Sequence, residues 1–315
     1  MYNSITKDWL VIVNPNAGVG KGLKDWEPIS QILHEHNFDY EVVFTEKKLH
    51  AIYLVQEKIE QGYRKIIVVG GDGTINEVVN GIFQQSIVET SDITIGMISV
   101  GTGNDWVRTF NIPTNYNEAI KTIKKEKTLL QDAGIVRYYN NAIESIRYFI
   151  NMAGLGFDAM VTEKTNADKE KGKKNPIIYL KNLLYSLIDY KSAKAKIKVD
   201  GLEVNEKFFS IGVGIGQYNG GGMQQAPKAI PDDGLFDITL IKHMNPLRVL
   251  ASVRRLYNGT IAKHKRVETY LAKNIFVESK IPILLEADGE TLGHSPFEFE
   301  IVPKSVKVIV NHLNK

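Results

Sequence analysis

A glycine-rich turn that carries one carboxylate is the first stretch of this chain whose residues could do chemistry. It reads Gly-Gly-Asp-Gly-Thr at 70–74, between a β-branched apolar run at 66–69 and an apolar helical pattern that begins at Ile75. The run is typical of a strand that is buried on both faces. Glycines let the backbone approach a ligand closely, and the N–H groups that open the next helix can bind an anion such as phosphate. The pattern predicts an anion-binding strand, turn and helix.

The carboxylate of Asp72 does not fit phosphate binding alone, because it would repel the phosphate. Its presence therefore indicates a bound metal ion or a proton transfer at the same place. The alternative interpretation is a plain connection between a strand and a helix through a Gly-Asp-Gly turn.

Two more strands end in polar, glycine-rich loops. The apolar run 10–13 leads into the loop 14–22, and the run 93–99 leads into 100–108. In an open α/β sheet the ligand site lies at the carboxyl ends of the strands. We therefore expect the three loops to converge on one site.

These loops carry a family resemblance. Asn-Pro-Asn-Ala-Gly at 14–18, Gly-Gly-Asp-Gly-Thr-Ile-Asn-Glu at 70–77 and Gly-Thr-Gly-Asn-Asp at 101–105 occur in this order. With them the chain resembles the diacylglycerol kinase catalytic family, above all its soluble bacterial lipid kinases. The resemblance implies ATP binding by Asn14, Pro15, Asn16, Ala17, Gly18, Thr45, Gly70, Gly71, Asp72, Gly73, Thr74, Asn76, Glu77 and Thr102. For Glu77, a charge that complements the helix dipole is the alternative.

The first half alternates strands and helices, which implies βαβ units and a parallel sheet. We predict a doubly wound α/β nucleotide-binding domain over 1–128, which the resemblance implies is completed by 304–315. The chain contains no G-x-x-x-x-G-K-[ST] sequence, so it is not a P-loop protein. It also has no G-x-G-x-x-G after its first strand, which disfavours a dinucleotide Rossmann domain.

The rhythm changes after residue 128. Successive short strands predict a mainly antiparallel β-sandwich over 129–303, which by resemblance binds the lipid. The charged segment 164–174 is expected to be a surface loop. The segment 176–190 predicts a helix with a broad apolar stripe, which either faces the core or meets the bilayer surface.

Two acidic turns of the second domain gain meaning only from the resemblance. In the segment 226–237 the family holds a structural Mg²⁺, which implies the Asp233 carboxylate and the backbone oxygens of Ile230 and Leu235 as ligands. A plain Asp-Gly turn is the alternative. In Asp288-Gly289-Glu290 the resemblance implies a catalytic pair, with Glu290 as proton acceptor and both carboxylates directed into a cleft between the domains. Alternatively, Asp72 takes the proton through a relay, or Asp72 and Asp288 hold catalytic Mg²⁺.

Composition sets broad limits. The 315 residues suggest about two domains, the net charge of +3 is slight, and there is no cysteine. We see no nucleic-acid motif, no signal peptide and no run of the roughly 20 apolar residues that a membrane span needs. We expect a cytoplasmic enzyme that meets its lipid transiently at the membrane surface. By resemblance a homodimer is one expected state.

Two other functions stay open at this stage. NAD kinase shares Gly-Gly-Asp-Gly-Thr and a two-domain plan, whereas the 101–105 loop and the Asp-Asp-Gly-Leu segment favour a lipid kinase. The other is a regulator that binds nucleotide or lipid without catalysis, against which the intact Asp72, Asp288 and Glu290 count.

Overall fold

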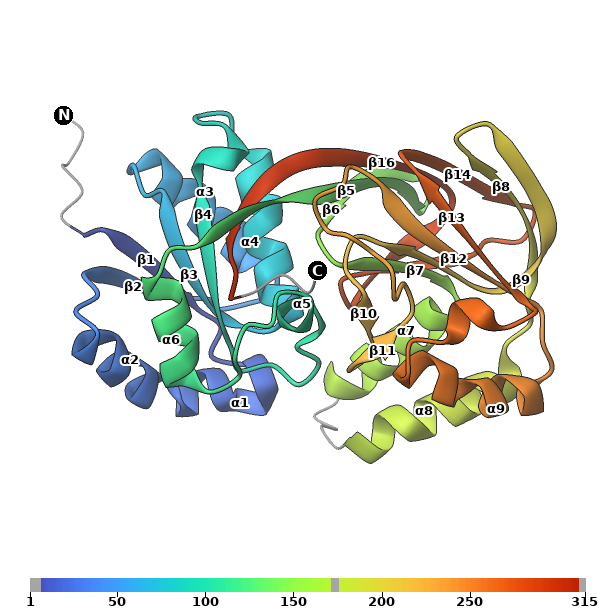
Figure 1. The fold of residues 1–315 in the computed structure, drawn as a ribbon, viewed down its shortest axis with the longest axis horizontal. Coiled ribbons are helices and arrows are strands. Elements are labelled where there is room, and N and C mark those ends of the chain that lie inside the picture. The colour runs from blue at the N-terminus through green and yellow to red at the C-terminus, as the bar shows by residue number, and fades with distance from the viewer. Residues whose placement is uncertain (1–6, 171–175, 312–315) are drawn as a thin grey trace. The chain divides into compact units, whose positions relative to one another are not determined.

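The computed structural model describes residues 7–170 and 176–311. It consists of two compact units (Figure 1). Unit 1 contains Met1–Ala133 and Pro303–Lys315, and unit 2 contains Gly134–Val302.

Unit 1 is built on a parallel sheet with the strand order β2-β1-β3-β4-β16. Its strands are β1 Trp9–Val13, β2 Tyr40–Phe44, β3 Lys65–Gly70, β4 Thr94–Ser99 and the last residues of β16 Glu290–Ile309. The central strands are continuous apolar runs because helices cover both faces of the sheet. This order confirms the predicted doubly wound α/β fold.

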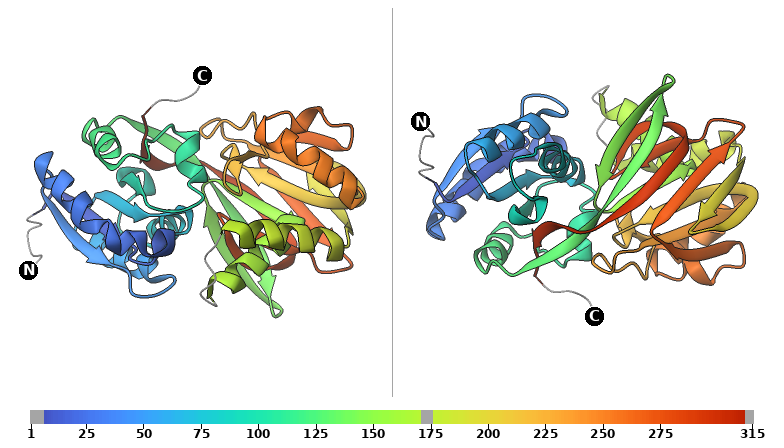
Figure 2. Two further views of the ribbon diagram at one scale, coloured as in Figure 1. Left: turned by 90° about the horizontal axis from the view of Figure 1, so that it is seen from below. Right: turned by 90° about the horizontal axis from the view of Figure 1, so that it is seen from above.

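The helices of unit 1 form two layers (Figure 2). On one face α2 Trp26–Glu35 and α6 Tyr116–Lys124 pack their apolar stripes against the sheet. On the other face α3 His50–Glu60 and α4 Asp72–Gln84 pack closely, since a Cβ on Gly81 would lie 2.6 Å from the Ile52 carbonyl oxygen. The remaining helices of the unit are α1 Ala17–Lys24, α5 Asp105–Thr109 and the 3₁₀ turn Thr90–Asp92.

The direction of winding reverses between β1 and β3. From β1 the chain moves outward to β2, whereas from β3 it moves to β4 on the opposite side. The loops after β1 and β3 therefore leave the sheet side by side, at the place where doubly wound sheets bind ligands.

Unit 2 is antiparallel, which confirms the predicted class of this domain. Its strands are β5 Thr128–Asn140, β6 Ile143–Phe149, β7 Met152–Gly156, β8 Ala193–Val199, β9 Leu202–Gly214, β10 Tyr218–Asn219, β11 Met223–Gln224, β12 Phe236–Lys242, β13 Val267–Ala272, β14 Asn274–Ser279, β15 Leu284–Ala287 and the first residues of β16. Two long strands, β9 and β16, each pair with different neighbours along their length. The first half of β9 pairs with β8 and its second half with β7. Likewise β16 pairs first with β15 and then with β14, and β14 pairs with β8. The pairing closes on itself around the apolar core of the unit.

Three helices cover one face of unit 2 (Figures 1 and 2). They are α7 Phe157–Glu170, α8 Pro176–Asp189 and α9 Pro246–Tyr257, with a 3₁₀ turn at Ile261–Lys263. Buried side chains from all three form one cluster with β9, β12 and β13. The helix expected at 176–190 is confirmed.

Two expectations for this half are wrong. Residues 164–170, expected in a surface loop, continue α7, and 171–174 lie outside the described residues. The sequence analysis also missed α9, although Asn245 and Pro246 are typical of a helix start.

Candidate functional site

The three glycine-rich loops of unit 1 meet, as expected, and their glycines allow it. A Cβ on Gly18 would lie 1.8 Å from the carbonyl oxygen of Val100, and one on Gly101 would lie 2.8 Å from the Cα of Gly71. No side chain fits at these positions. The loops after β1, β3 and β4 therefore form one continuous backbone surface.

Asn14 joins the first two loops through its side chain. Its Nδ2 donates to Thr74 Oγ1 at 3.0 Å, and its Oδ1 accepts from the backbone N–H of Asn16 at 3.0 Å. Gly70 makes room for this bond, since a Cβ there would lie 2.5 Å from Thr74 Oγ1. Asn14 and Thr74 thus hold the loop after β1 against the first turn of α4.

The loop after β1 passes into a kinked helix, α1. Gly18, Val19 and Gly20 all have left-handed backbone conformations, with φ of 59°, 66° and 86°. This is strained for a β-branched residue such as Val19. The close contact of Gly18 with Val100 holds the chain in this shape.

The turn at 70–74 ends in the N-terminus of α4, a helix of 13 residues. Gly71 is its N-cap, in an extended conformation, and no side chain caps this end. Helix N-termini of this kind attract anions.

Asp72 is the first residue of α4, but its carboxylate is directed elsewhere. Its oxygens accept hydrogen bonds from the backbone N–H groups of Trp106 at 3.1 Å and Asp105 at 3.3 Å, at the start of α5. Burial raises the pKa of Asp72, and these amides partly offset the increase. The repulsion noted in the sequence is thereby relieved, because the carboxylate binds α5 rather than lying over its own helix terminus.

Asp105, the last residue of the motif at 101–105, is a further buried acidic residue of this region. It is 7% exposed, and Arg108 lies 3.8 Å from its carboxylate. A Cβ on Gly103 would lie 3.0 Å from an oxygen of Asp72 and 3.5 Å from one of Asp105. The two carboxylates therefore flank Gly103. The signal was present in the motif at 101–105, which ends in this aspartate.

The other predicted nucleotide contacts of unit 1 lie in different surroundings. Thr45 is buried at the end of β2, where its N–H donates to the Val13 carbonyl. Asn76 is buried in α4, and its side chain accepts from Asn80. Glu77 accepts from the N–H groups of Leu49 and Ala51, at the start of α3. Thr102 is exposed. Nucleotide binding by these residues stays a prediction.

In unit 2 the Asp288-Gly289 pair forms the tight turn between β15 and β16. Both residues have positive φ, of 48° and 83°, as a two-residue hairpin turn requires. The carboxylate of Asp288 accepts from the N–H groups of Ile150, Asn151 and Met152 at 2.9 to 3.0 Å. Asp288 therefore points into unit 2, which differs from the expectation that both carboxylates of the motif point into a cleft. Glu290, on the far side of the turn, is partly buried.

Two more carboxyl groups are buried near this turn, and the sequence analysis did not identify them as site residues. Glu286 is 1% exposed, and its Oε2 accepts from Gly289 N–H at 3.0 Å. Asp158 accepts from Ser210 Oγ and, at 2.8 Å, from Gln225 Nε2. A Cβ on Gly154 would lie 2.6 Å from Glu286 Oε1 and 3.0 Å from the Cβ of Asp158.

Burial raises the pKa of both carboxyl groups. For Glu286 the charges of Asp158 and Asp288 raise it further, while the amide of Gly289 and the side chain of Asn219 lower it. For Asp158 the hydrogen bonds from Ser210 and Gln225 offset part of the increase. Both carboxyl groups therefore hold their protons to higher pH than exposed carboxyl groups do.

The predicted Mg²⁺ ligands lie in the loop before β12. Asp233 Oδ1 accepts from Leu235 N–H at 3.0 Å, and Ile230 is exposed. Burial, and then the charge of Asp233, raises the pKa of Asp237 to about 6. Two carboxylates that repel each other beside backbone oxygens suit a hard cation such as Mg²⁺. In the described part of the chain, however, no three acidic, histidine or cysteine side chains gather as a metal site.

Comparison with known proteins assigns both halves of the chain. Residues 8–136 match the diacylglycerol kinase catalytic domain, and residues 151–310 match the YegS C-terminal NAD kinase beta sandwich-like domain. The chain belongs to the family of diacylglycerol kinases and YegS-type lipid kinases. As a member it is a phosphotransferase with an alcohol group as acceptor.

Similar proteins cover nearly the whole chain of this lipid kinase. A Bacillus subtilis protein named "Putative lipid kinase YtlR" is 29% identical over 95% of this chain and 98% of its own. A diacylglycerol kinase of Staphylococcus saprophyticus is 28% identical over 95% and 93%. The crystal structure of "a putative diacylglycerol kinase" from Bacillus anthracis superimposes with a TM-score of 0.77 at 28% identity, over 99% and 98%.

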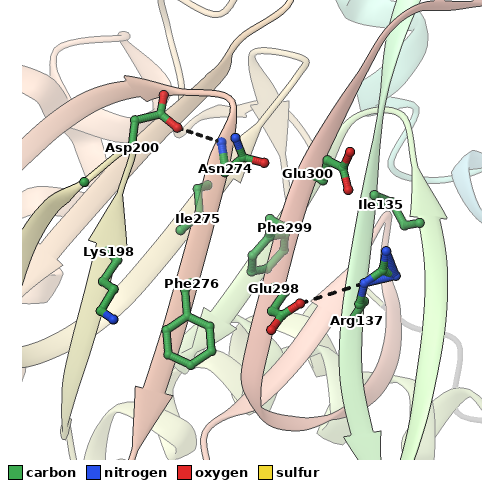
Figure 3. A pocket seen from close by; sticks show the side chains of 11 residues that line it. Ile135, Arg137, Lys198, Asp200, Asn274, Ile275, Phe276, Glu298, Phe299 and Glu300 are labelled. Carbon is green, nitrogen blue, oxygen red and sulfur yellow. Dashed lines mark hydrogen bonds and ion pairs between the residues drawn. The ribbon is translucent and has the colours of Figure 1, made fainter.

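The lipid kinase also has an open hollow on the outside of unit 2, of about 350 Å³ (Figure 3). Its walls come from β5, β8, β14 and β16, and Arg137 and Glu298 face each other across it at 3.8 Å. Asp200 uses its carboxylate to accept from the N–H groups of Lys273 and Asn274. None of the predicted site residues lines this hollow.

No helix within 7–170 and 176–311 combines the length and the apolar character that crossing a bilayer requires.

Proposed function

We propose that this lipid kinase transfers the γ-phosphate of ATP to the hydroxyl group of diacylglycerol or a related lipid. The observation that carries the proposal is the backbone surface of unit 1, where three glycine-rich loops meet beside the uncapped N-terminus of α4. Such a surface suits the phosphates of a nucleotide, because it offers N–H donors and excludes side chains. Whole-chain relatives named diacylglycerol kinase support the acceptor class.

The chain supplies positioning and charge, which are what phosphoryl transfer mainly needs from a protein. Asn14, Gly18, Gly71 and Gly101 shape the loops that receive the phosphates. Asp72 holds α5 in place and, with its raised pKa, is a better proton acceptor than an exposed aspartate.

Glu290 is the proposed base that takes the proton of the lipid hydroxyl. Asp288 cannot share this role equally, since three backbone amides already occupy its carboxylate. We propose that Asp288 is a positioning residue. Its hydrogen bonds fix the turn that precedes Glu290, the first residue of β16. The alternative base is Asp72, which would act through a relay.

Mg²⁺ has two places in this proposal. One ion accompanies ATP, and a separate structural ion would be held in unit 2 by Asp233 with the backbone oxygens of Ile230 and Leu235. Bound Mg²⁺ supplies positive charge that neutralises neighbouring carboxylates. Asp233 and Asp237 fit this need, since burial and then the charge of Asp233 raise the pKa of Asp237.

The test is transfer of radiolabelled γ-phosphate by the purified protein to detergent-dispersed lipids, with Mg²⁺ present. The panel contains diacylglycerol, a sphingoid base, ceramide, a polyprenol and phosphatidylglycerol, with NAD in a parallel reaction. We expect label in a lipid, and a loss of at least about 100-fold with Glu290→Gln. Label in NADP, or no transfer to any lipid while ATP still binds, would overturn the proposal.

A further inference from the structure

A long stretch of unit 2 carries only positive charge. Residues 238–267 contain no aspartate or glutamate. The same stretch contains Lys242, Arg248, Arg254, Arg255, Lys263, Lys265 and Arg266. It comprises most of β12, α9, the 3₁₀ turn after it and the connection to β13. Since the whole chain has a net charge of only +3, this is a strong local concentration of charge.

The basic groups of this stretch are mostly not neutralised. Of these seven basic side chains, only Lys242 forms ion pairs within the described residues. It binds Glu206 and Glu268. Burial, and then the charges of Arg255, Lys265, Arg248 and Arg266, lowers the pKa of His264. The positive charges therefore gather around one place rather than spreading along the chain.

Apolar side chains stand among these charges on the outward face of α9. Leu247 is 79% exposed and Leu250 50%, and Tyr257 near the end of the helix is 55% exposed. The inward face is formed by Val249 and Ser252, which are buried against the unit. The helix is thus anchored by one face and leaves apolar groups on the other.

The end of α8 also carries exposed apolar side chains. Ile188 is 77% exposed and Tyr185 56%, while Leu187 lies in the same buried cluster as Val249 of α9. Both helices cover the same face of unit 2 (Figures 1 and 2). Exposed apolar residues gathered in this way mark an interaction surface.

We propose that the outward face of α9, together with the exposed end of α8, docks this enzyme on an anionic lipid bilayer. Apolar side chains that enter the interface, surrounded by arginine and lysine that meet acidic headgroups, are the two components of reversible membrane binding. A second copy of this chain does not fit, because two such basic surfaces would repel each other. The inference deepens the proposed function and rests on its lipid acceptor, which lies in the bilayer.

The experiment is co-sedimentation of the full chain with vesicles, without ATP, so that it does not depend on turnover. Vesicles of phosphatidylcholine with one fifth phosphatidylglycerol are compared with phosphatidylcholine alone. The test variants are the triple change Arg248→Gln, Arg254→Gln, Lys265→Gln, and the double change Leu247→Ser, Leu250→Ser. The matched control, Lys121→Gln, Lys124→Gln, Lys125→Gln, removes the same charge from α6 of unit 1.

We expect wild type and control to bind the anionic vesicles, and the basic triple variant to bind about 100-fold more weakly, at roughly 5-fold per basic group. The leucine variant should bind at least about 10-fold more weakly. Thermal unfolding and transfer to a lipid in detergent micelles should be near wild type for both, since none of these residues belongs to the proposed site.

Three results would overturn the inference. These are no preference of wild type for anionic vesicles, wild-type binding by the basic triple variant, or an equal loss with the α6 control. The proposed function fails separately, if the protein binds these vesicles yet phosphorylates no lipid.

Discussion

At the scale of single residues, Asp288 and Glu290 share one motif but do different work. The carboxylate of Asp288 accepts three backbone hydrogen bonds at 2.9 to 3.0 Å inside unit 2. In Asp288→Asn the amide NH₂ would face at least one of these donors, so we expect a loss of about 2–4 kcal/mol in the free energy of unfolding. Urea unfolding measures it.

Glu290→Gln is the matched variant on the other side of the turn. Its unfolding free energy should stay within about 1 kcal/mol of wild type, while its phosphate transfer is lost. If Asp288→Asn were as stable as wild type, our assignment of Asp288 to positioning would be wrong.

Glu286 makes stability depend on pH, because burial and the neighbouring carboxylates raise its pKa well above the ordinary value. The folded state holds the proton more tightly than the unfolded chain does. This stabilisation is therefore complete at pH values below the unfolded pKa, and it is lost as the pH rises through the folded pKa. Glu286→Gln removes the titration and keeps an oxygen for Gly289 N–H.

We expect the stability of Glu286→Gln relative to wild type to increase with pH above about 4.5, by at most about 1.4 kcal/mol per pH unit. Unfolding free energies between pH 4 and 8 measure the difference. The exposed Glu144→Gln serves as control and should give a flat difference. A flat difference for Glu286→Gln as well would contradict the raised pKa.

Asp237 reports on the proposed Mg²⁺ site without any turnover. Its pKa is raised to about 6, by burial and then by Asp233. A cation bound at Asp233 adds positive charge nearby and favours the ionised form, so Mg²⁺ should lower the pKa of Asp237. Carbon-detected NMR titration of the aspartate carboxyls, with and without Mg²⁺, measures the shift. No shift in Mg²⁺, or the same shift in Asp233→Asn, would argue against this site.

At the scale of elements, the close approach of the loops after β1, β3 and β4 depends on glycines, which have no side chain. In Gly18→Ala the new methyl group would lie 1.8 Å from the Val100 oxygen, in a backbone conformation with φ of 59°. We expect a loss of about 3 kcal/mol or more in unfolding free energy, and weaker ATP binding. Gly20→Ala isolates the contribution of backbone strain, because φ there is 86° but nothing lies within 4 Å.

Gly20→Ala should lower the stability by about 1 kcal/mol and leave ATP affinity nearly unchanged. Thermal unfolding and calorimetric ATP titration distinguish the two variants. Equal effects would mean that backbone strain alone, and not the contact between loops, governs this part of the site.

Sequence patterns predicted elements well where a residue's neighbours along the chain decide its structure. The strands that end in glycine loops, and the helix at 176–190, are of this kind. The patterns failed where distant partners decide. Nothing near Asp288 in the chain indicates that amides at 150–152 will bind it, and Glu77 finds its donors at Leu49 and Ala51. The helix α9 was also missed, although Asn245 caps its N-terminus and Pro246 lies in its first turn.

At the scale of the whole molecule, the chain returns to unit 1 after building unit 2. The end of β16 pairs in parallel with β4, through Lys307 and Val308. Nearby, Thr90 Oγ1 donates to the Ser305 carbonyl, and Val310 N–H donates to the Lys127 carbonyl. Unit 1 therefore includes a strand that lies more than 160 residues away from the rest of its sequence, as was predicted only from the family resemblance.

This return predicts how truncation acts. A chain that ends at Val302 keeps all of unit 2 but leaves β4 as an open sheet edge and exposes the apolar residues beneath Val306, Val308 and Ile309. We expect it to lose ATP binding and the unfolding transition of unit 1, with aggregation through the open edge. A chain that ends at Asn311 retains these contacts and should behave as wild type. Calorimetry with and without ATP compares the two chains, and retained ATP binding after Val302 would show that the catalytic sheet does not need its last strand.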